Sequence, residues 1–402
     1  MGYDFDPADI EYLTSAAGVA ALDEVDRLEL SSATRLRDVQ RVRREYGPWS
    51  AALIETVRLR RRAAAKLIGA RQWLFTDDAL QQATPTMVAR HRATRLAGRA
   101  VHDVTCSIGA ELAELARVCP AVVGSDLDTV RLRMARHNLA HRDEPTDATS
   151  VTSQVVLVRG DALRPCSTGT VVIADPARRA DGRRTYDPAK LQPPLPDLLD
   201  AYFGRELAVK CAPGLDFDRL DWAGEVEIVS LDGSVREACL WSPGLTEPGI
   251  TRRATVLTTA GTATTLTDAD PDDIPERAPG EWIVDPDGAV VRAGLVRHYA
   301  ARHGLWQLDP RIAYLTGDRL PAGVRGFRVL DRLDLREKAL RSELRRRDCG
   351  PLEILVRGVD IDPDRLRQRL KPSGSRPYTL VVTRIGRAAT VFLCTAHRDA
   401  EA

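Results

Sequence analysis

Hydrophobic and polar positions follow two different periods along the chain, and each period predicts its own kind of element. Over the first hundred residues apolar side chains recur every three or four positions, for example at Leu22, Val25 and Leu28, which predicts amphipathic helices. From residue 100 onwards, short apolar runs alternate with amphipathic stretches. This alternation of strand and helix predicts a parallel α/β sheet with helices packed on its faces.

The middle of the chain shows the alternation most clearly. Its predicted elements are strands at 100–105, 121–125, 155–159, 171–174, 207–211, 226–229 and 239–241, with helices at 109–118 and 128–140. The polar stretch 142–153 is predicted to be a loop. Residues 260–281 are rich in Thr, Asp and Pro, and we expect a surface loop or domain boundary there, because the carboxylates lack the spacing of a calcium loop.

The last eighty residues predict a separate small α+β unit. Its predicted elements are strands at 327–330, 352–356, 380–383 and 390–394, and helices at 336–347 and 364–370. We therefore expect a helical N-terminal region at 1–95, a Rossmann-like seven-stranded core at 96–316 and an α+β domain at 317–402.

Composition narrows the function only slightly. The chain has 402 residues, and its net charge of +1 excludes a uniformly basic nucleic-acid binder but not a local basic face. No apolar run approaches the roughly 20 residues that span a membrane, and the seven cysteines form no CxxC pair. We expect a cytoplasmic protein with no membrane partner, no disulfide framework and no metal site.

The high arginine content of this chain is weak evidence for nucleic-acid binding. Only five of its 58 basic residues are lysine, and such an excess of arginine weakens any argument from arginine to nucleic acid. Residues 35–71 carry eleven basic and three acidic residues, and a solvated helical face is the simpler interpretation of this region.

Acidic residues follow four successive predicted strands. They are Asp103, Asp126, Asp161 and Asp175. An acid after a single strand is usually an ordinary turn or helix cap. In doubly wound sheets, however, ligands bind at the carboxyl ends of the strands, so four such acids in order predict one shared ligand site.

The turn after the first strand indicates what kind of ligand this is. The G-x-G-x-x-G pattern of dinucleotide sites is absent, because only Gly109 remains and Ser107 stands where another glycine would be expected. The ligand therefore need not contain a pyrophosphate. An adenosine with a charged amino-acid tail fits better.

Five short motifs carry a resemblance to a known family. They are Asp103-x-x-Cys106-x-x-Gly109, Asp126-Leu127-Asp128, the Ala-Arg-His-Asn of 135–138, Gly160-Asp161, and the Thr-Pro stretch of 84–91. On these motifs, residues 84–179 resemble class I S-adenosylmethionine-dependent methyltransferases, particularly the trimethylguanosine synthase-like group. The resemblance implies a methyltransferase that uses S-adenosyl-L-methionine.

The resemblance also implies how the cofactor would be held. Asp103 and the backbone of 106–109 would hold its methionine end, and Asp126 would accept both ribose hydroxyls. Leu127 would cover the adenine, and Asp161 would bond the adenine amino group beside Ala162. The full implied set is Thr84, Asp103, Thr105, Cys106, Ser107, Ile108, Gly109, Asp126, Leu127, Asp161 and Ala162.

The fourth motif implies the catalytic residues Asp175, Pro176 and Arg178. In amino-methylating relatives it reads Asp/Asn/Ser-Pro-Pro-aromatic, and its oxygens hold the target N–H group. Here Ala177 and Arg178 follow Asp175-Pro176, so the stacking ring is missing. Arg178 could stack on a base or grip phosphate instead, and a surface or ion-pair role is the alternative. Because the methyl group is already activated, positioning and electrostatics could carry most of the catalysis.

Residues 318–398 resemble a THUMP-like unit, most recognisably in the Arg-Gly-Val-Asp of 357–360. True THUMP modules bind RNA, so the resemblance implies an RNA partner such as tRNA or rRNA. We predict methyl transfer to a nitrogen of an RNA base. One alternative is a catalytically weak or inactive cofactor-binding protein that interacts with RNA, and another is a methyltransferase for a small molecule or protein. The basic face of Arg336, Arg341 and 345–347 fits either a solvated helix or phosphate contact.

Several other conspicuous residues are expected to be structural. Cys106 lies at a predicted helix N-terminus, but packing is the favoured interpretation. The same holds for His91 and His137 on helices and for Trp73 and Phe75 before the Thr-Pro stretch.

Overall fold

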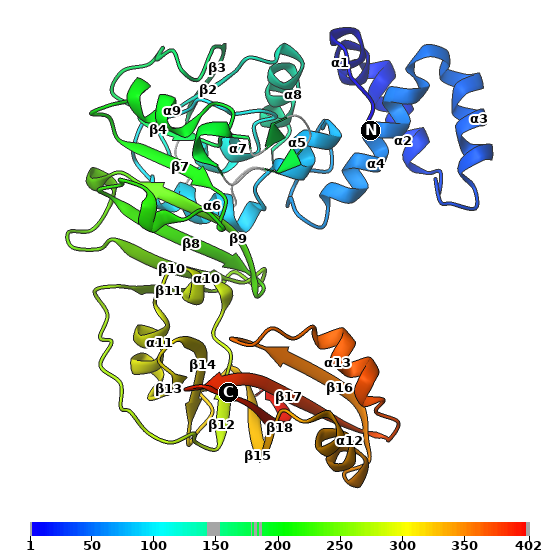
Figure 1. Cartoon of the computed structure of the whole chain (residues 1–402). Helices are drawn as coiled ribbons and strands as arrows, with labels where there is room; N and C mark the ends of the chain where they lie inside the picture. Colours follow the sequence, from blue (N-terminus) through cyan, green and yellow to red (C-terminus); the bar gives the residue numbers. More distant parts are fainter. Residues whose placement is uncertain (1, 143–152, 178, 181–182, 185–186, 399–402) are drawn as a thin grey trace. The chain divides into compact units, whose positions relative to one another are not determined.

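The computed structural model describes residues 2–142, 153–177, 179–180, 183–184 and 187–398 (Figure 1). The chain forms two compact units. The first comprises Met1–Asp232, Arg236–Pro248 and Leu257–Thr262, and the second comprises Gly233–Val235, Gly249–Val256 and Ala263–Ala402.

The first unit begins with the predicted helices. They are α1 (Pro7–Thr14), α2 (Ala16–Asp26), α3 (Arg35–Tyr46), α4 (Ser50–Ala63), α5 (Asp77–Gln82) and α6 (Thr86–Arg95), with the 3₁₀ turn η1 (Gly47–Trp49). Local sequence sets their ends. The Asp6 carboxylate caps α1 by accepting from the backbone N–H groups of Ala8 and Asp9, and Gly47, with a φ of 54°, ends α3.

Seven neighbouring strands of a nine-stranded sheet lie in this unit, in the order β8-β9-β7-β4-β1-β2-β3. Their bounds are β1 (Val101–Asp103), β2 (Ala121–Asp126), β3 (Gln154–Arg159), β4 (Val171–Ala174), β7 (Leu207–Cys211), β8 (Glu225–Leu231) and β9 (Ser234–Trp241). Strands β1 to β4 and β7 run parallel, whereas β9 is antiparallel to β7.

Helices and short segments complete the first unit. They are α7 (Ala110–Leu115), α8 (Thr129–Ala140), α9 (Leu195–Ala201), the small ribbon of β5 (Arg179–Ala180) and β6 (Arg183–Arg184), and the 3₁₀ turns η2 (Pro188–Lys190), η3 (Phe217–Arg219) and η4 (Pro243–Leu245). Every residue of β4 and β7 is buried, as expected for parallel strands that have both faces covered.

The second unit contains a seven-stranded sheet in the order β13-β14-β12-β15-β18-β17-β16. Its strands are β12 (Trp282–Val284), β13 (Trp306–Asp309), β14 (Ile312–Gly317), β15 (Arg325–Asp334), β16 (Cys349–Val356), β17 (Arg376–Ile385) and β18 (Ala388–Arg398), and the unit also holds β10 (Arg252–Leu257) and β11 (Ala263–Thr267). Its helices are α10 (Gly288–Arg292), α11 (Val296–His303), α12 (Glu337–Arg346) and α13 (Pro363–Leu370). Leucines of α12 and α13 pack on the sheet around Leu380 and Leu393.

The predicted fold class is confirmed, with one correction inside it. The stretch 260–281, expected to be a loop, contains strand β11. Within that strand only Leu266 is buried, so no apolar run revealed it. The loop predicted at 142–153 lies mostly outside the described residues. The predicted domain boundaries at 95/96 and 316/317 remain predictions.

Candidate active site

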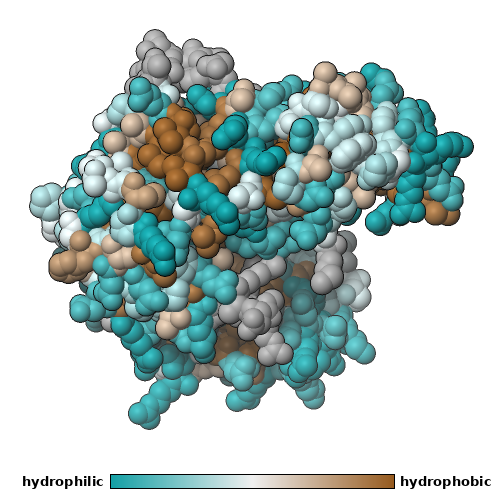
Figure 2. Space-filling view, turned by 90° about the horizontal axis from the view of Figure 1, so that it is seen from above, coloured by the Kyte–Doolittle hydropathy of each residue, from teal (hydrophilic) through white to brown (hydrophobic). Residues whose placement is uncertain are grey.

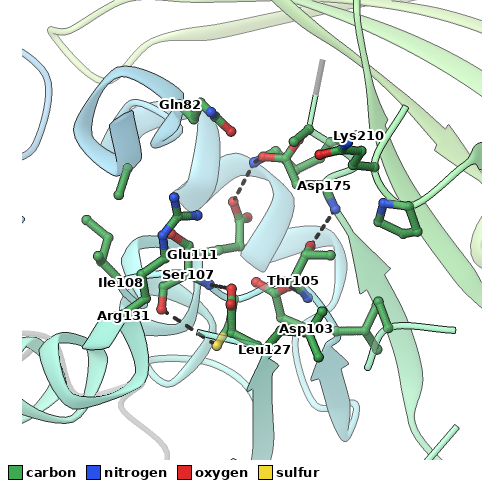
Figure 3. A pocket seen from close by; sticks show the side chains of 18 of the residues that line it. Gln82, Asp103, Thr105, Ser107, Ile108, Glu111, Leu127, Arg131, Asp175 and Lys210 are labelled. Carbon is green, nitrogen blue, oxygen red and sulfur yellow. Dashed lines mark hydrogen bonds and ion pairs between the residues drawn. The ribbon is translucent and has the colours of Figure 1, made fainter. Parts of the chain in front are cut away.

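A pocket of about 450 Å³ opens at the carboxyl ends of the central strands of the first unit (Figure 3). Asp103, Asp126, Asp161 and Asp175, which follow β1, β2, β3 and β4, all line it. The four strand ends therefore meet at one crevice, as the sequence predicted. Further lining residues come from 79–84, 104–108, 160–163 and 192–194, together with Ala110, Glu111, Leu127, Arg131, Ala177 and Lys210.

The turn after β1 is held by its own acid. The Asp103 carboxylate accepts hydrogen bonds from the Thr105 backbone N–H at 3.0 Å and from the Thr105 hydroxyl at 3.4 Å. The pKa of Asp103 is raised to about 7, mainly by burial and also by the nearby Glu111 and Asp175 carboxylates, while the Thr105 hydrogen bond and the Lys210 ammonium act to lower it. The Thr105 hydroxyl oxygen in turn accepts the backbone N–H of Asp175 at 2.7 Å. One side chain thus joins the ends of β1 and β4.

The backbone of this turn takes the shape that glycine usually provides. Ser107 has a φ of 48°, which lies in the left-handed region, and its N–H donates to Asp126 Oδ2 at 2.9 Å. Gly109 also has a positive φ, of 80°. A Cβ at Gly109 would lie 3.2 Å from Ala135 Cβ, so this glycine lets α7 and α8 approach closely.

Backbone groups also orient the acid after β2. Asp126 Oδ1 accepts the N–H of Asp128 at 2.9 Å, while Oδ2 accepts that of Ser107. The next side chain, Leu127, is 63% exposed although it is large and apolar. After β3, Asp161 Oδ1 accepts the N–H of Leu163 at 2.9 Å, and the neighbouring Ala162 is buried.

Lys210 on β7 is a site residue that the sequence analysis missed. Its side chain is only 8% exposed, and its ammonium lies 2.5 Å from Asp175 Oδ2 and 3.8 Å from Glu111 Oε2 (Figure 3). Burial alone would lower the pKa of Lys210, but the carboxylates of Asp175 and Glu111 raise it, so the ammonium stays charged. One signal was available. A lysine stands within the apolar run Leu-Ala-Val-Lys-Cys of a chain that otherwise uses arginine.

Ion pairs continue from Lys210 into the core. Arg92 on α6 is 2% exposed, and it donates to Glu111 Oε1 at 3.1 Å and to Glu237 Oε1 at 2.5 Å. Negative and positive charges therefore alternate from Asp175 through Lys210, Glu111 and Arg92 to Glu237. We call these five residues the buried charge chain. Buried charges require such partners, because an unpaired ion in the protein interior is costly.

Most of the predicted site residues line the pocket. They are Thr84, Asp103, Thr105, Cys106, Ser107, Ile108, Asp126, Leu127, Asp161, Ala162 and Asp175. Gly109 and Pro176 are described but do not line it, and Arg178 lies outside the described residues. The buried hydroxyl of Thr84 has no hydrogen-bond partner in the described part of the chain.

The residues expected to be structural occupy structural positions. Cys106 is buried, and burial raises the pKa of its thiol well above the usual value, which suits packing. Trp73 and Phe75 lie in the core. His91 contacts Glu227 at 2.7 Å, and His137 contacts the Gln72 carbonyl at 2.9 Å, so neither histidine faces the pocket.

Strand order and pocket position together define a Rossmann-like methyltransferase architecture, and comparisons with known proteins agree. An uncharacterized S-adenosylmethionine-dependent methyltransferase of Mycobacterium tuberculosis strain H37Rv is 55% identical over 370 residues, covering 89% of this chain and 100% of the relative. The counterpart in strain CDC 1551 has the same identity and coverage. The chain therefore belongs to the S-adenosylmethionine-dependent methyltransferases, and its cofactor is S-adenosyl-L-methionine. The narrower trimethylguanosine synthase-like resemblance stays a prediction.

Other comparisons concern the fold and the separate parts of the chain. The crystal structure of a proposed methyltransferase from Porphyromonas gingivalis W83 has a TM-score of 0.73 and 18% identity, covering 99% of this chain and 100% of that one. This likeness shows the fold alone. Residues 324–396 match the family described as THUMP domain-like, and residues 6–63 match a domain of unknown function.

The described residues contain neither a metal-binding cluster nor a membrane-spanning helix. No group of His, Cys, Asp and Glu side chains in this part of the chain could hold a metal ion. Among the same residues, no helix is both long and apolar enough to cross a membrane.

Proposed function

We propose that this methyltransferase modifies a nitrogen of an RNA base, with Asp175 as the acceptor of the target N–H group. The observation that carries the proposal is the position of Asp175. Its side chain is 32% exposed at the end of β4, and it lines the same pocket as Asp103 and Asp126. A carboxylate there can hold an amine beside the methyl donor.

The pocket residues fit the cofactor by their chemistry. Asp103 offers a buried carboxylate for the ammonium of the methionine end, and Asp126 offers carboxylate oxygens to the ribose hydroxyls. Exposed Leu127 offers an apolar surface to the adenine, Asp161 lies beside it as an acceptor, and the unpartnered Thr84 hydroxyl can take a further bond. A volume of about 450 Å³ lies within the usual range for small-molecule sites. When bound, S-adenosyl-L-methionine supplies an activated methyl group.

Lys210 acts through Asp175 and is therefore a positioning residue. Its ammonium donates to Asp175 Oδ2 and fixes the orientation of this carboxylate. Oδ1 has no partner among the described residues. That oxygen can accept the target N–H and direct the nitrogen lone pair toward the methyl group. Preorganised groups of this kind act mainly by positioning and electrostatics.

The segment after Asp175 offers a substitute for the missing aromatic ring. The Ala177 N–H donates to the Gln192 carbonyl at 2.7 Å, and the Gln192 N–H donates back to the Ala177 carbonyl at 3.1 Å. These bonds hold Pro193 and Pro194 in the pocket wall. We propose that the two proline rings present the apolar surface against which the base lies. The catalytic roles of Pro176 and Arg178 stay predictions.

The RNA part of the proposal is supported by the second unit. Residues 324–396 match the THUMP domain-like family, and true THUMP modules bind RNA. A small molecule or a protein would give no reason for such a unit.

Nucleoside mass spectrometry tests the proposal directly. RNA from cells with and without the gene would be digested and compared, and we expect one methylated nucleoside to disappear without the gene. The purified protein should then transfer labelled methyl groups from S-adenosylmethionine to total RNA of the deletion strain. Unchanged nucleosides, with label entering protein or small molecules instead, would contradict an RNA substrate.

A further inference from the structure

Helix α3 in the domain of unknown function presents a row of arginines to solvent. Its twelve residues include five arginines and two acids. Arg37, Arg41 and Arg44 are spaced i, i+4 and i+7, so they share one face of the helix. Asp38 and Val42 are buried on the other side. We call Arg37, Arg41 and Arg44 the arginine face.

Arginines on the neighbouring helix α4 are already occupied. Arg58 pairs with Glu55 at 2.8 Å, and Arg62 pairs with Asp77. Arg61 pairs with Asp26 at 3.1 Å and also donates to the carbonyl groups of Leu28 and Glu29. These guanidinium groups join parts of the fold and leave little capacity for a ligand.

The arginine face differs from α4 in this respect. Arg41 and Arg44 are exposed and make no hydrogen bond or ion pair within the described part of the chain. Among the residues that the structure describes, Arg37 forms an ion pair only with its neighbour Asp38, at 3.4 Å, and its side chain remains 78% exposed. Three guanidinium groups are thus available on one face.

The fold holds α3 in a fixed place. The Asp38 carboxylate accepts the Leu30 N–H at 3.2 Å, and Val42 packs into the main core of the first unit. Figure 1 shows α3 at the outer end of the helical region, away from β4 and β7 of the same unit. Figure 2 shows that this end is covered largely by hydrophilic side chains.

We propose that the arginine face binds the phosphate backbone of the RNA whose base enters the pocket; this inference rests on the proposed function. Seven residues of helix span about 10 Å, so the three guanidinium groups can reach neighbouring phosphates along one strand. Arginine binds phosphate in a bidentate manner without reading sequence. Since the whole chain has a net charge of only +1, RNA binding needs such a local surface.

A matched pair of triple variants tests the arginine face. The first is Arg37→Gln, Arg41→Gln and Arg44→Gln, which keeps good helix formers. The control is Arg27→Gln, Arg71→Gln and Arg99→Gln, which removes three exposed charges of the first unit outside helix α3. Binding of both proteins and the wild type to a defined RNA hairpin would be measured by gel shift over a range of salt concentrations.

We expect the α3 variant to bind RNA at least about tenfold more weakly at low salt. The slope of log affinity against log salt should become less steep by about two to three. The control should stay near wild type. Circular dichroism and calorimetry with S-adenosylmethionine would show that each variant is folded and keeps its cofactor site.

The outcomes separate this inference from the proposed function. If the wild type binds RNA and the α3 variant binds equally well, or if the control variant loses as much affinity, the arginine face does not bind RNA, and the proposed RNA substrate is unaffected. If the wild type binds no RNA even at low salt, both ideas fail.

Discussion

The buried charge chain under the pocket and the charged cluster on α12 both combine acidic and basic side chains, but they differ in their access to water. On α12, Glu343 pairs with Arg346 and Arg347, both at 2.5 Å, and Arg346 is 66% exposed. Under the pocket, Arg92 and Lys210 are almost completely buried.

As a result, the pKa values of acids in the two regions are shifted in opposite directions. Hydrogen bonds from Arg346 and Arg347 lower the pKa of Glu343 to about 2. Burial raises the pKa of Glu237, at the inner end of the buried charge chain, above its ordinary value. Similar residues thus serve a ligand site in one region and a local surface contact in the other. The comparison teaches that burial and pairing, rather than the number of charges, distinguish a site from a solvated helix.

Removing Lys210 should have the largest effect on stability. Lys210→Met leaves the partly exposed Asp175 and the buried Glu111 without their shared cation, so we expect the free energy of unfolding to fall by about 3–5 kcal/mol. Denaturant unfolding measures it. The same change in a Glu111→Gln background should cost less, because one of the two carboxylates that contact the ammonium is then neutral. An equal loss of unfolding free energy in both backgrounds would show that Lys210 and Glu111 are not energetically coupled.

Asp175→Ala should abolish turnover while leaving cofactor affinity nearly intact. Loss of the group that holds the target N–H should lower kcat by about 10²–10³, measured with labelled S-adenosylmethionine and RNA of a deletion strain. Asp175→Asn keeps an acceptor oxygen and should retain more activity. Full turnover in the alanine variant would rule out Asp175 as the target-amine site.

Asp126→Ala should weaken cofactor binding instead. Loss of one charged hydrogen-bond acceptor costs about 1.5–3 kcal/mol, so the dissociation constant of S-adenosylmethionine should rise about 10-fold to 100-fold. Calorimetry checks this, and Asp128→Ala, which changes the nearby helix cap, is the matched control. An unchanged constant would remove Asp126 from the cofactor site.

Cofactor affinity should depend on the protonation of Asp103. With a pKa of about 7, this acid is ionised above neutral pH and protonated below it. Because the ammonium of the cofactor would be held by the carboxylate, affinity should fall by up to about tenfold for each pH unit below 7. Calorimetry between pH 8 and pH 6, with Asp103→Asn for comparison, measures this. A flat profile in the wild type would contradict the role.

Glu343→Gln should have the smallest effect. The pKa of Glu343 is lower in the folded protein than its ordinary value of 4.5, so its contribution to stability is present above about pH 4.5 and is lost as the pH falls toward 2. Because the arginines are largely exposed, we expect a loss below about 1 kcal/mol. Chemical unfolding at pH 7 and pH 3 should show the variant and wild type converging at the lower pH. A larger loss would mean that this cluster behaves like the buried one.

Sequence patterns predicted the elements whose hydrophobic signal is continuous. The run at 171–174 gave β4, which is buried on both faces as a central parallel strand, and the run at 121–125 gave β2, which is partly buried. The acids at their ends could be placed in one pocket for the same topological reason. Short or half-polar strands such as β11 and β12 gave no such run and were missed.

The missed parts of the site depend on contacts between distant residues. Lys210 meets Asp175 across 35 positions, and no local pattern shows that a lysine in an apolar strand faces an acid. Gly109 was predicted as part of the ligand turn, but its packing against Ala135 depends on how α7 meets α8. Sequence therefore indicated where the chemistry lies more reliably than how it is supported.

The Thr105 hydroxyl has a consequence for how the two ligands of this enzyme would communicate. Asp103, which we propose holds the methionine end, and the backbone N–H of Asp175, whose carboxylate we propose accepts the target N–H, both hydrogen-bond to this one side chain. We therefore expect that a ligand that shifts one strand end also shifts the other through Thr105, which would couple the order in which the two ligands bind.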